Sequence, residues 1–198
     1  MNLGKILTRS ARYWPNLEAA VDSRLRLTFA ELERRTNRLA SGLVNLDLPE
    51  GAHIAILAPN RVELIEAEVA LYKAAMVKVP INARLSIDEI IRVLEDSQSV
   101  GVITIPAFAR AIQQRRSEVP RLQWIISLGE DAGDINYSEV LAKGSETFEA
   151  RDPADDKLAV LHYTSGSSGV LKAAMLSYGN RKALIRKSLA SPTRRAEP

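Results

Sequence analysis

The sequence predicts an α/β protein in which helices flank a layered, largely parallel β-sheet. Three observations predict this class: short apolar runs alternate with amphipathic helical patterns, two capping boxes mark helix starts, and 46% of the 198 residues are hydrophobic. Strands separated by helices pair in parallel, because each helix carries the chain back to the same end of the sheet. The length suits one domain or two small ones, and the apolar fraction excludes a chain that is disordered throughout.

The first part of the chain predicts a short helix, two short strands and a long helix. The apolar residues Leu3, Ile6 and Leu7 indicate a helix that ends near Pro15. Strands are expected at 19–22 and 25–28, around a turn, and Thr28 with Glu31 forms a capping box that starts the next helix. The apolar stripe of that helix consists of Phe29, Leu32, Thr36, Leu39, Ala40 and Leu43.

Strands and helices then alternate. The expected elements are strands at 53–58, 77–81, 100–105 and 123–128, with helices at 62–75, 86–94 and 107–116 between them. The strands are nearly continuous apolar runs, as buried parallel strands are, and Ser86 with Glu89 forms the second capping box. Residues 129–157 predict a surface connection with a short helix near 137–142, followed by a strand at 157–164 and a return strand at 171–177.

The net charge of +3 is unevenly distributed along the chain. Residues 181–198 contain six basic residues against one glutamate, a local charge of +5, so residues 1–180 carry −2. We therefore expect a mildly acidic folded body over residues 1–180 and a basic, unstructured tail over residues 181–198. Because the basicity is confined to this tail, we expect no nucleic-acid partner.

The composition excludes several classes of site. The chain has no cysteine, which excludes disulfides, thiolate nucleophiles and cysteine-ligated metals, and its two histidines disfavour a histidine-rich metal site. The longest uncharged apolar stretch, residues 97–109, spans 13 residues, short of the roughly 20 that cross a bilayer. The prediction is a cytoplasmic protein with no metal site and no transmembrane segment.

The segment with the clearest chemistry is a run of glycine and hydroxyl residues followed by a lysine. Its members are Thr164, Ser165, Gly166, Ser167, Ser168 and Gly169, with Lys172 three positions later. Glycines let backbone N–H groups approach an anion, consecutive amides form anion-binding nests, and a lysine supplies a mobile point charge. Composition alone leaves two alternatives open, a polyphosphate cradle or a flexible Ser/Gly turn. A Walker A loop is excluded, because it needs Gly at Leu171 and Ser or Thr at Ala173.

The run from Tyr163 to Lys172 resembles the phosphate-loop signature of the adenylate-forming superfamily, which includes acyl-CoA synthetases, luciferases and peptide-synthetase adenylation domains. Further blocks that resemble this family lie at 27–32, 36–40, 53–60, 71–75, 79–85 and 94–97. The motif Pro80-x-Asn82-x-Arg84-Leu85 is most similar to the corresponding motif of fatty acyl-CoA synthetases and acyl-AMP ligases. The resemblance ends near residue 180, so the basic tail is expected to be foreign to the family. Together the blocks favour the phosphate cradle over the flexible turn.

The resemblance implies the front part of the large N-terminal domain of these enzymes and the activity of an AMP-forming fatty acid–CoA ligase. Such enzymes join a carboxylate to the α-phosphate of ATP, release pyrophosphate, and pass the acyl group to a thiol. ATP, Mg²⁺ and CoA are the implied cofactors, and a fatty acid or another carboxylate is the implied substrate. Residues 164–169 and Lys172 match the loop that holds the outer phosphates.

The resemblance also implies groups that these 198 residues do not contain: an adenine-binding segment, a glutamate near magnesium, a ribose-binding aspartate and the catalytic lysine of a hinged C-terminal domain. We therefore expect an incomplete ligase that arose by truncation or frameshift rather than as a purposeful short form. The alternative is a non-catalytic fragment that binds a nucleotide or pairs with a second polypeptide carrying the missing groups.

Five positions depart from the usual residues of the family. Ser168 replaces threonine, Leu171 proline, Ala173 glycine, Tyr178 histidine and Ala75 a glycine at a helix end. Ala75 is the departure with the clearest physical consequence, because the left-handed backbone typical of such a helix end disfavours alanine.

The remaining notable side chains are predicted to be structural. For His162 a place in the packed interior is favoured over a place in a substrate pocket. Packing roles are expected for His53, Trp14 and Trp124, and solvated helix faces for Arg34, Arg35, Arg115 and Arg116.

Overall fold

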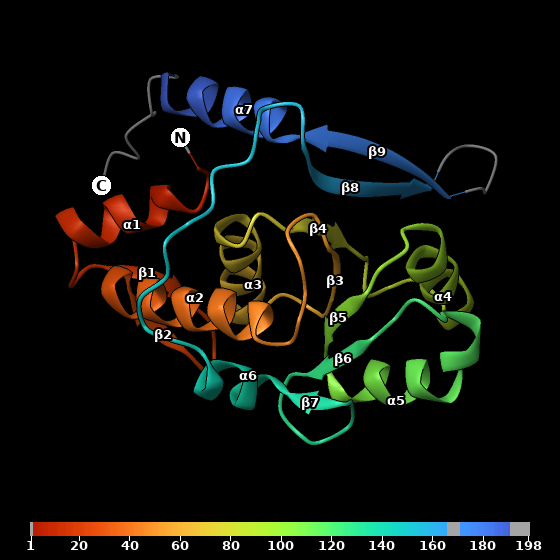
Figure 1. Cartoon of the computed structure of the whole chain (residues 1–198). Coiled ribbons are helices and arrows are strands. Elements are labelled where there is room, and N and C mark those ends of the chain that lie inside the picture. Colours follow the sequence, from red (N-terminus) through yellow and green to blue (C-terminus); the bar gives the residue numbers. More distant parts are fainter. Residues whose placement is uncertain (1, 166–170, 191–198) are drawn as a thin grey trace.

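The computed structural model describes residues 2–165 and 171–190 and confirms the predicted α/β class (Figure 1). Its elements in chain order are α1 (Lys5–Tyr13), β1 (Glu18–Val21), β2 (Arg26–Thr28), α2 (Phe29–Val44), β3 (His53–Leu57), α3 (Val62–Lys73), β4 (Val77–Pro80), α4 (Ile87–Asp96), β5 (Gly101–Thr104), α5 (Pro106–Gln114), a 3₁₀ turn (Arg116–Glu118), β6 (Trp124–Ser127), β7 (Ile135–Asn136), α6 (Tyr137–Lys143), β8 (Leu158–Ser165), β9 (Leu171–Ser177) and α7 (Tyr178–Ala190). The sequence pattern did not predict the short strand β7, the 3₁₀ turn or helix α7.

The central sheet has seven strands in the order β7-β6-β5-β3-β4-β8-β9. The first six strands of this order, from β7 through β8, are parallel to their neighbours. The last strand, β9, pairs antiparallel with β8 at the edge of the sheet. Strands β1 and β2 form a separate antiparallel pair. The antiparallel edge follows directly from the predicted return strand, because β8 and β9 are joined by a loop too short for a helical crossover.

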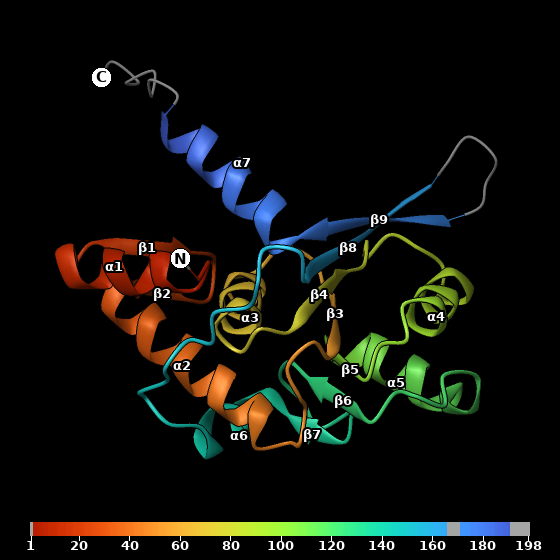
Figure 2. The same cartoon turned by 45° about the horizontal axis from the view of Figure 1, so that its top comes forward.

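Helices cover both faces of the sheet (Figures 1 and 2). Helices α2, α3 and α6 pack with Ile54 and Ile56 of β3 on one face, and α4 and α5 pack with Ala55 and Leu57 on the other. This alternation along β3 follows the two-residue period of a strand, and both faces are apolar because both are buried.

Both predicted capping boxes are present. The Thr28 hydroxyl accepts a hydrogen bond from the Glu31 N–H at 3.3 Å, and the Glu31 carboxylate accepts from the Thr28 N–H at 2.8 Å. Ser86 and Glu89 make the same pair of bonds at 3.3 and 2.8 Å. Each box satisfies backbone donors that the first turn of a helix leaves without partners, so α2 and α4 begin where the sequence predicts.

The tail prediction is wrong for residues 181–190, which continue α7. Two of its basic side chains pair with acidic partners from distant parts of the chain: Lys182 Nζ lies 2.7 Å from Asp155 Oδ1, and Arg181 Nη2 lies 3.2 Å from Glu68 Oε1. The predicted boundary at residue 180 therefore falls inside a docked helix. Residues 191–198 lie outside the described part of the chain.

Several arginines expected on solvated faces form ion pairs instead. Arg35 pairs through its Nε with the fully buried Glu66, a residue of the neighbouring helix α3. Arg115 lies 2.7 Å from Glu118, and Arg116 lies 2.7 Å from Asp134. Helical periodicity predicts which face a residue occupies, but it does not predict a partner that another element supplies.

The tryptophans differ from each other. Trp124 packs against the core and donates its indole N–H to the Leu46 carbonyl at 3.2 Å, as a packing residue should. The packing role predicted for Trp14 is wrong, because its side chain is exposed at the end of α1.

No helix within the described residues is long and apolar enough to cross a membrane.

Candidate phosphate-binding site

The β8–β9 hairpin brings together two of the predicted phosphate ligands. Thr164 lies directly opposite Lys172, and Ser165 lies opposite Leu171. Residues directly opposite each other in an antiparallel pair share one face, so the Thr164 hydroxyl and the exposed Lys172 side chain project on the same side of the hairpin. The other predicted ligands, Gly166, Ser167, Ser168 and Gly169, lie outside the described residues.

The hairpin meets a second sequence block at the carboxyl end of β4. A pocket of about 250 Å³ is lined by Thr164, Tyr163, Pro80, Asn82 and Leu85, among others. The backbone after β4 turns here, because the Asn82 side chain accepts a hydrogen bond from the Arg84 N–H at 3.0 Å. The fold thus joins the Pro80–Leu85 block to the phosphate-loop block, although about 80 residues separate them in the sequence.

Tyr163 ties this hairpin to the helix on the other side of the pocket. Its hydroxyl donates to Asp96 Oδ2 at 2.5 Å. Burial, followed by the hydrogen bond to Asp96 and the charge of that carboxylate, raises the pKa of Tyr163 well above its ordinary value. The phenol therefore stays protonated at neutral pH and acts as a fixed donor that orients the base of the loop.

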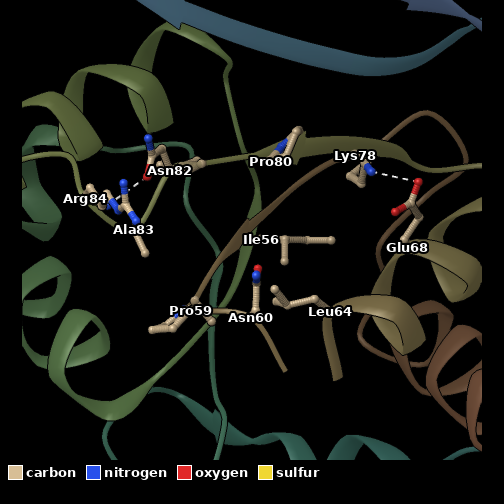
Figure 3. A pocket seen from close by; sticks show the side chains of 12 residues that line it. Ile56, Pro59, Asn60, Leu64, Glu68, Lys78, Pro80, Asn82, Ala83 and Arg84 are labelled. Atoms are coloured by element: carbon tan, nitrogen blue, oxygen red, sulfur yellow. Dashed lines mark hydrogen bonds and ion pairs between the residues drawn. The ribbon is translucent and has the colours of Figure 1, made fainter. Parts of the chain in front are cut away.

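A larger pocket of about 580 Å³ lies beside the first and shares Pro80 and Asn82 with it (Figure 3). Figure 3 shows Lys78 and Glu68 at one end and Asn82 and Arg84 at the other. The Lys78 ammonium, which is almost fully buried, lies 2.8 Å from Glu68 Oε1. Lys78 was not predicted as a site residue, although a single lysine inside the apolar strand run VKVP was a usable signal.

Glu68 holds several donors at the base of the hairpin. Its Oε1 atom accepts hydrogen bonds from the Tyr72 hydroxyl at 3.0 Å and from Arg181 Nη2 at 3.2 Å, in addition to its ion pair with Lys78. Burial alone would raise the pKa of Glu68, but the Lys78 charge, the hydrogen bonds from Lys78 and Tyr72 and the Arg181 charge together lower it. This carboxylate therefore links α3, β4 and α7 directly below the hairpin.

Neither histidine contributes a buried catalytic group. His162 is largely exposed on β8, so its predicted packing role is wrong. Partial desolvation of the ring, followed by the charges of nearby Lys78 and Arg181, lowers its pKa. His53 is structural as predicted, since its Nδ1 lies 2.6 Å from the Ser97 carbonyl oxygen.

The donors at the hairpin suit a polyphosphate better than a metal cage. Within residues 2–165 and 171–190, no three histidine, cysteine, aspartate or glutamate side chains are grouped so as to hold a metal ion. Mg²⁺ in nucleotide sites is held by phosphate oxygens and water with one or two carboxylates. The hydroxyl of Thr164 and the ammonium of Lys172 suit phosphate oxygens, and those oxygens would hold the Mg²⁺ that accompanies a nucleotide.

Comparison with known proteins agrees with the motif blocks. The family model described as AMP-binding enzyme matches residues 7–196. The chain belongs to the AMP-binding enzyme family. Because the match continues through residue 196, the prediction that the family resemblance ends near residue 180 is wrong, and the basic segment is part of the AMP-binding sequence.

The curated relatives of this AMP-binding chain are acyl-CoA synthetases and related ligases. Feruloyl-CoA synthase of Amycolatopsis sp is 33% identical over 187 residues, which cover 90% of this chain and 34% of that protein. Long-chain-fatty-acid–CoA ligase FadD13 of Mycobacterium tuberculosis is 32% identical over 179 residues, which cover 85% and 33%. The chain thus spans about a third of the length of these relatives.

Solved structures show the same fold. A long-chain-fatty-acid–CoA ligase from Archaeoglobus fulgidus superposes with a TM-score of 0.86 at 22% identity, covering 96% of this chain and 39% of that one. The N-terminal domain of FACL13 from Mycobacterium tuberculosis gives 0.79 at 29% identity, covering 89% and 44%. The AMP-binding chain therefore has the fold of the N-terminal portion of adenylate-forming enzymes.

Proposed function

We propose that this chain is the phosphate-binding front portion of an AMP-forming fatty acid–CoA ligase. The observation that carries the proposal is the placement of Thr164 opposite Lys172 at the end of the β8–β9 hairpin. A hydroxyl and an ammonium on one face suit a polyphosphate, because a charge-assisted hydrogen bond contributes roughly 1.5–3 kcal/mol. The relatives named feruloyl-CoA synthase and long-chain-fatty-acid–CoA ligase support a carboxylate substrate and CoA as the acyl acceptor.

In the proposed site the loop residues position the outer phosphates of ATP and neutralise their charge. These residues are Thr164, Ser165, Gly166, Ser167, Ser168, Gly169 and Lys172. ATP, Mg²⁺ and CoA are the proposed cofactors. The Tyr163–Asp96 hydrogen bond fixes β8 one residue before Thr164, and the Lys78–Glu68 ion pair lies beside the start of the same strand.

The proposed ligase is incomplete in this chain, because the adenine, ribose and catalytic-lysine groups that the resemblance implies are not among its residues. The test is pyrophosphate exchange with the purified chain, ATP and a panel of fatty acids. We expect no carboxylate-dependent exchange. Exchange that rises with an added fatty acid would contradict the incomplete-ligase proposal, since it would require complete adenylation machinery within these 198 residues.

A further inference from the structure

A second surface, on α1, combines cations with exposed aromatic rings. Residues 2–17 contain Lys5, Arg9 and Arg12 and no aspartate or glutamate. Helix α1 directs Leu7 into the interior, and the three cations lie on its exposed side. Within the described residues none of the three forms an ion pair, unlike most arginines of the folded body. Their charge is therefore available to an external anionic partner.

The aromatic side chains lie at the end of the same helix. Tyr13 is 62% exposed, Trp14 54% and Leu17 58%, although side chains of this size are usually buried. The two rings lie side by side with centroids 6.0 Å apart, and the Arg9 guanidinium lies 5.8 Å from the Tyr13 ring centroid. The exposed cations and rings therefore neighbour one another along one helix. Helix α1 lies at the edge of the molecule, away from the β8–β9 hairpin (Figures 1 and 2).

We propose that this surface docks on the face of a bilayer that contains anionic phospholipid. The α1 surface consists of Lys5, Arg9, Arg12, Tyr13, Trp14 and Leu17. Lysine and arginine side chains are attracted to anionic headgroups, and tyrosine and tryptophan favour the membrane–water interface, where the ring is in an apolar layer and its polar tip stays hydrated. An acidic protein would satisfy the cations, but a lipid interface matches the cations and the amphipathic rings together.

Binding to vesicles tests the proposal with the full chain. We expect co-sedimentation with vesicles of phosphatidylcholine and phosphatidylglycerol, little with phosphatidylcholine alone, and weaker binding in 1 M salt because charges are then screened. Arg12→Gln should weaken binding about fivefold. Arg92→Gln removes the same charge from the exposed face of α4, and it should change binding by less than about twofold. Equal losses in the two variants would overturn the assignment to α1.

Tryptophan fluorescence tests whether the rings enter the interface. The chain has two tryptophans, so Trp124→Phe leaves Trp14 as the sole reporter, and circular dichroism checks that this variant is folded. We expect a blue shift of its emission with anionic vesicles and quenching by brominated lipid. Unchanged emission, or binding to heparin or RNA as tight as binding to the vesicles, would overturn the proposal in favour of a general attraction to polyanions.

Discussion

Ala75 occupies a backbone conformation that suits glycine. Its φ is 55°, directly after α3, whereas the preceding Ala74 has φ −80°. The family resemblance expects glycine at this position, and the structure confirms the left-handed geometry that makes glycine favourable there. The alanine therefore stores local strain of about 1–2 kcal/mol.

Glycine substitutions at these two neighbours measure that strain. Both alanines are buried, so both variants lose one methyl group and gain backbone freedom in the unfolded chain. Only Ala75→Gly relieves strain, so it should be about 1–2 kcal/mol more stable than Ala74→Gly in urea unfolding. Equal free energies of unfolding for the two variants would contradict this account.

Asp22 acts as a cap for a helix to which it does not belong. Its carboxylate accepts hydrogen bonds from the N–H groups of Arg24 at 2.7 Å, Leu25 at 2.8 Å and Val62 at 2.9 Å. Val62 is the first residue of α3, whose own N-cap, Arg61, makes no capping bond. These backbone donors hold the pKa of Asp22 well below its ordinary 3.8.

The pH dependence of stability tests this cap. Because the folded-state pKa is lowered, the stabilisation is present above pH 3.8 and is lost as the pH falls toward the folded pKa. Asp22→Asn should lower the thermal midpoint at pH 7, and its difference from the natural protein should shrink as the pH falls below 3.8. Asp156→Asn, at an exposed turn, is the control. A difference that stays constant with pH would contradict the cap.

At the scale of elements, a buried carboxylate joins three helices. Glu66 of α3 is fully buried, pairs with Arg35 of α2 and accepts a hydrogen bond from the Tyr137 hydroxyl of α6 at 2.8 Å. Burial, then the Glu66 charge, raises the pKa of Tyr137 well above its ordinary value, so the phenol remains a donor. Helix packing on this face of the sheet therefore includes a specific polar contact within an apolar layer.

Removing the charge at Glu66 should be costly. A buried pair that loses one partner leaves the other charge uncompensated, so we expect Glu66→Gln to destabilise the protein by about 3 kcal/mol in urea unfolding. Glu139→Gln, on the exposed side of α6, should change stability by less than about 0.5 kcal/mol. A Glu66→Gln variant as stable as the Glu139→Gln control would show that the three-helix contact does not stabilise the fold.

For the whole molecule, local signals predicted the architecture, and distant partners account for the differences. Apolar runs and capping boxes located helices α1 to α6 and the longer strands, because both signals depend on residues within a few positions. Strand β7 was missed because two residues show no periodicity. The pairing of Arg35 with Glu66 and the docking of Lys182 on Asp155 depend on partners 31 and 27 residues away, which a local pattern does not specify.

In the candidate site, too, the local features were predicted from the sequence and the contacts between distant segments were not. The glycine and hydroxyl run located the loop, and the expected return strand placed Thr164 near Lys172. The two pockets beside the hairpin were not predicted. The smaller one forms where the turn after β4 meets β8, and the larger one contains the ion pair between Glu68 of α3 and Lys78 of β4. Such a site is a product of the sheet order, which joins segments that are far apart in the sequence.

The affinity of the chain for MgATP, measured by titration calorimetry, tests the central claim most directly. Lys172→Ala removes the proposed phosphate-binding cation, and Lys157→Ala removes the same charge just before the opposite end of β8. We expect Lys172→Ala to weaken binding by at least about tenfold, and Lys157→Ala to change it by less than about twofold. Equal affinity in the natural chain and the Lys172→Ala variant would contradict the phosphate-binding role of the hairpin.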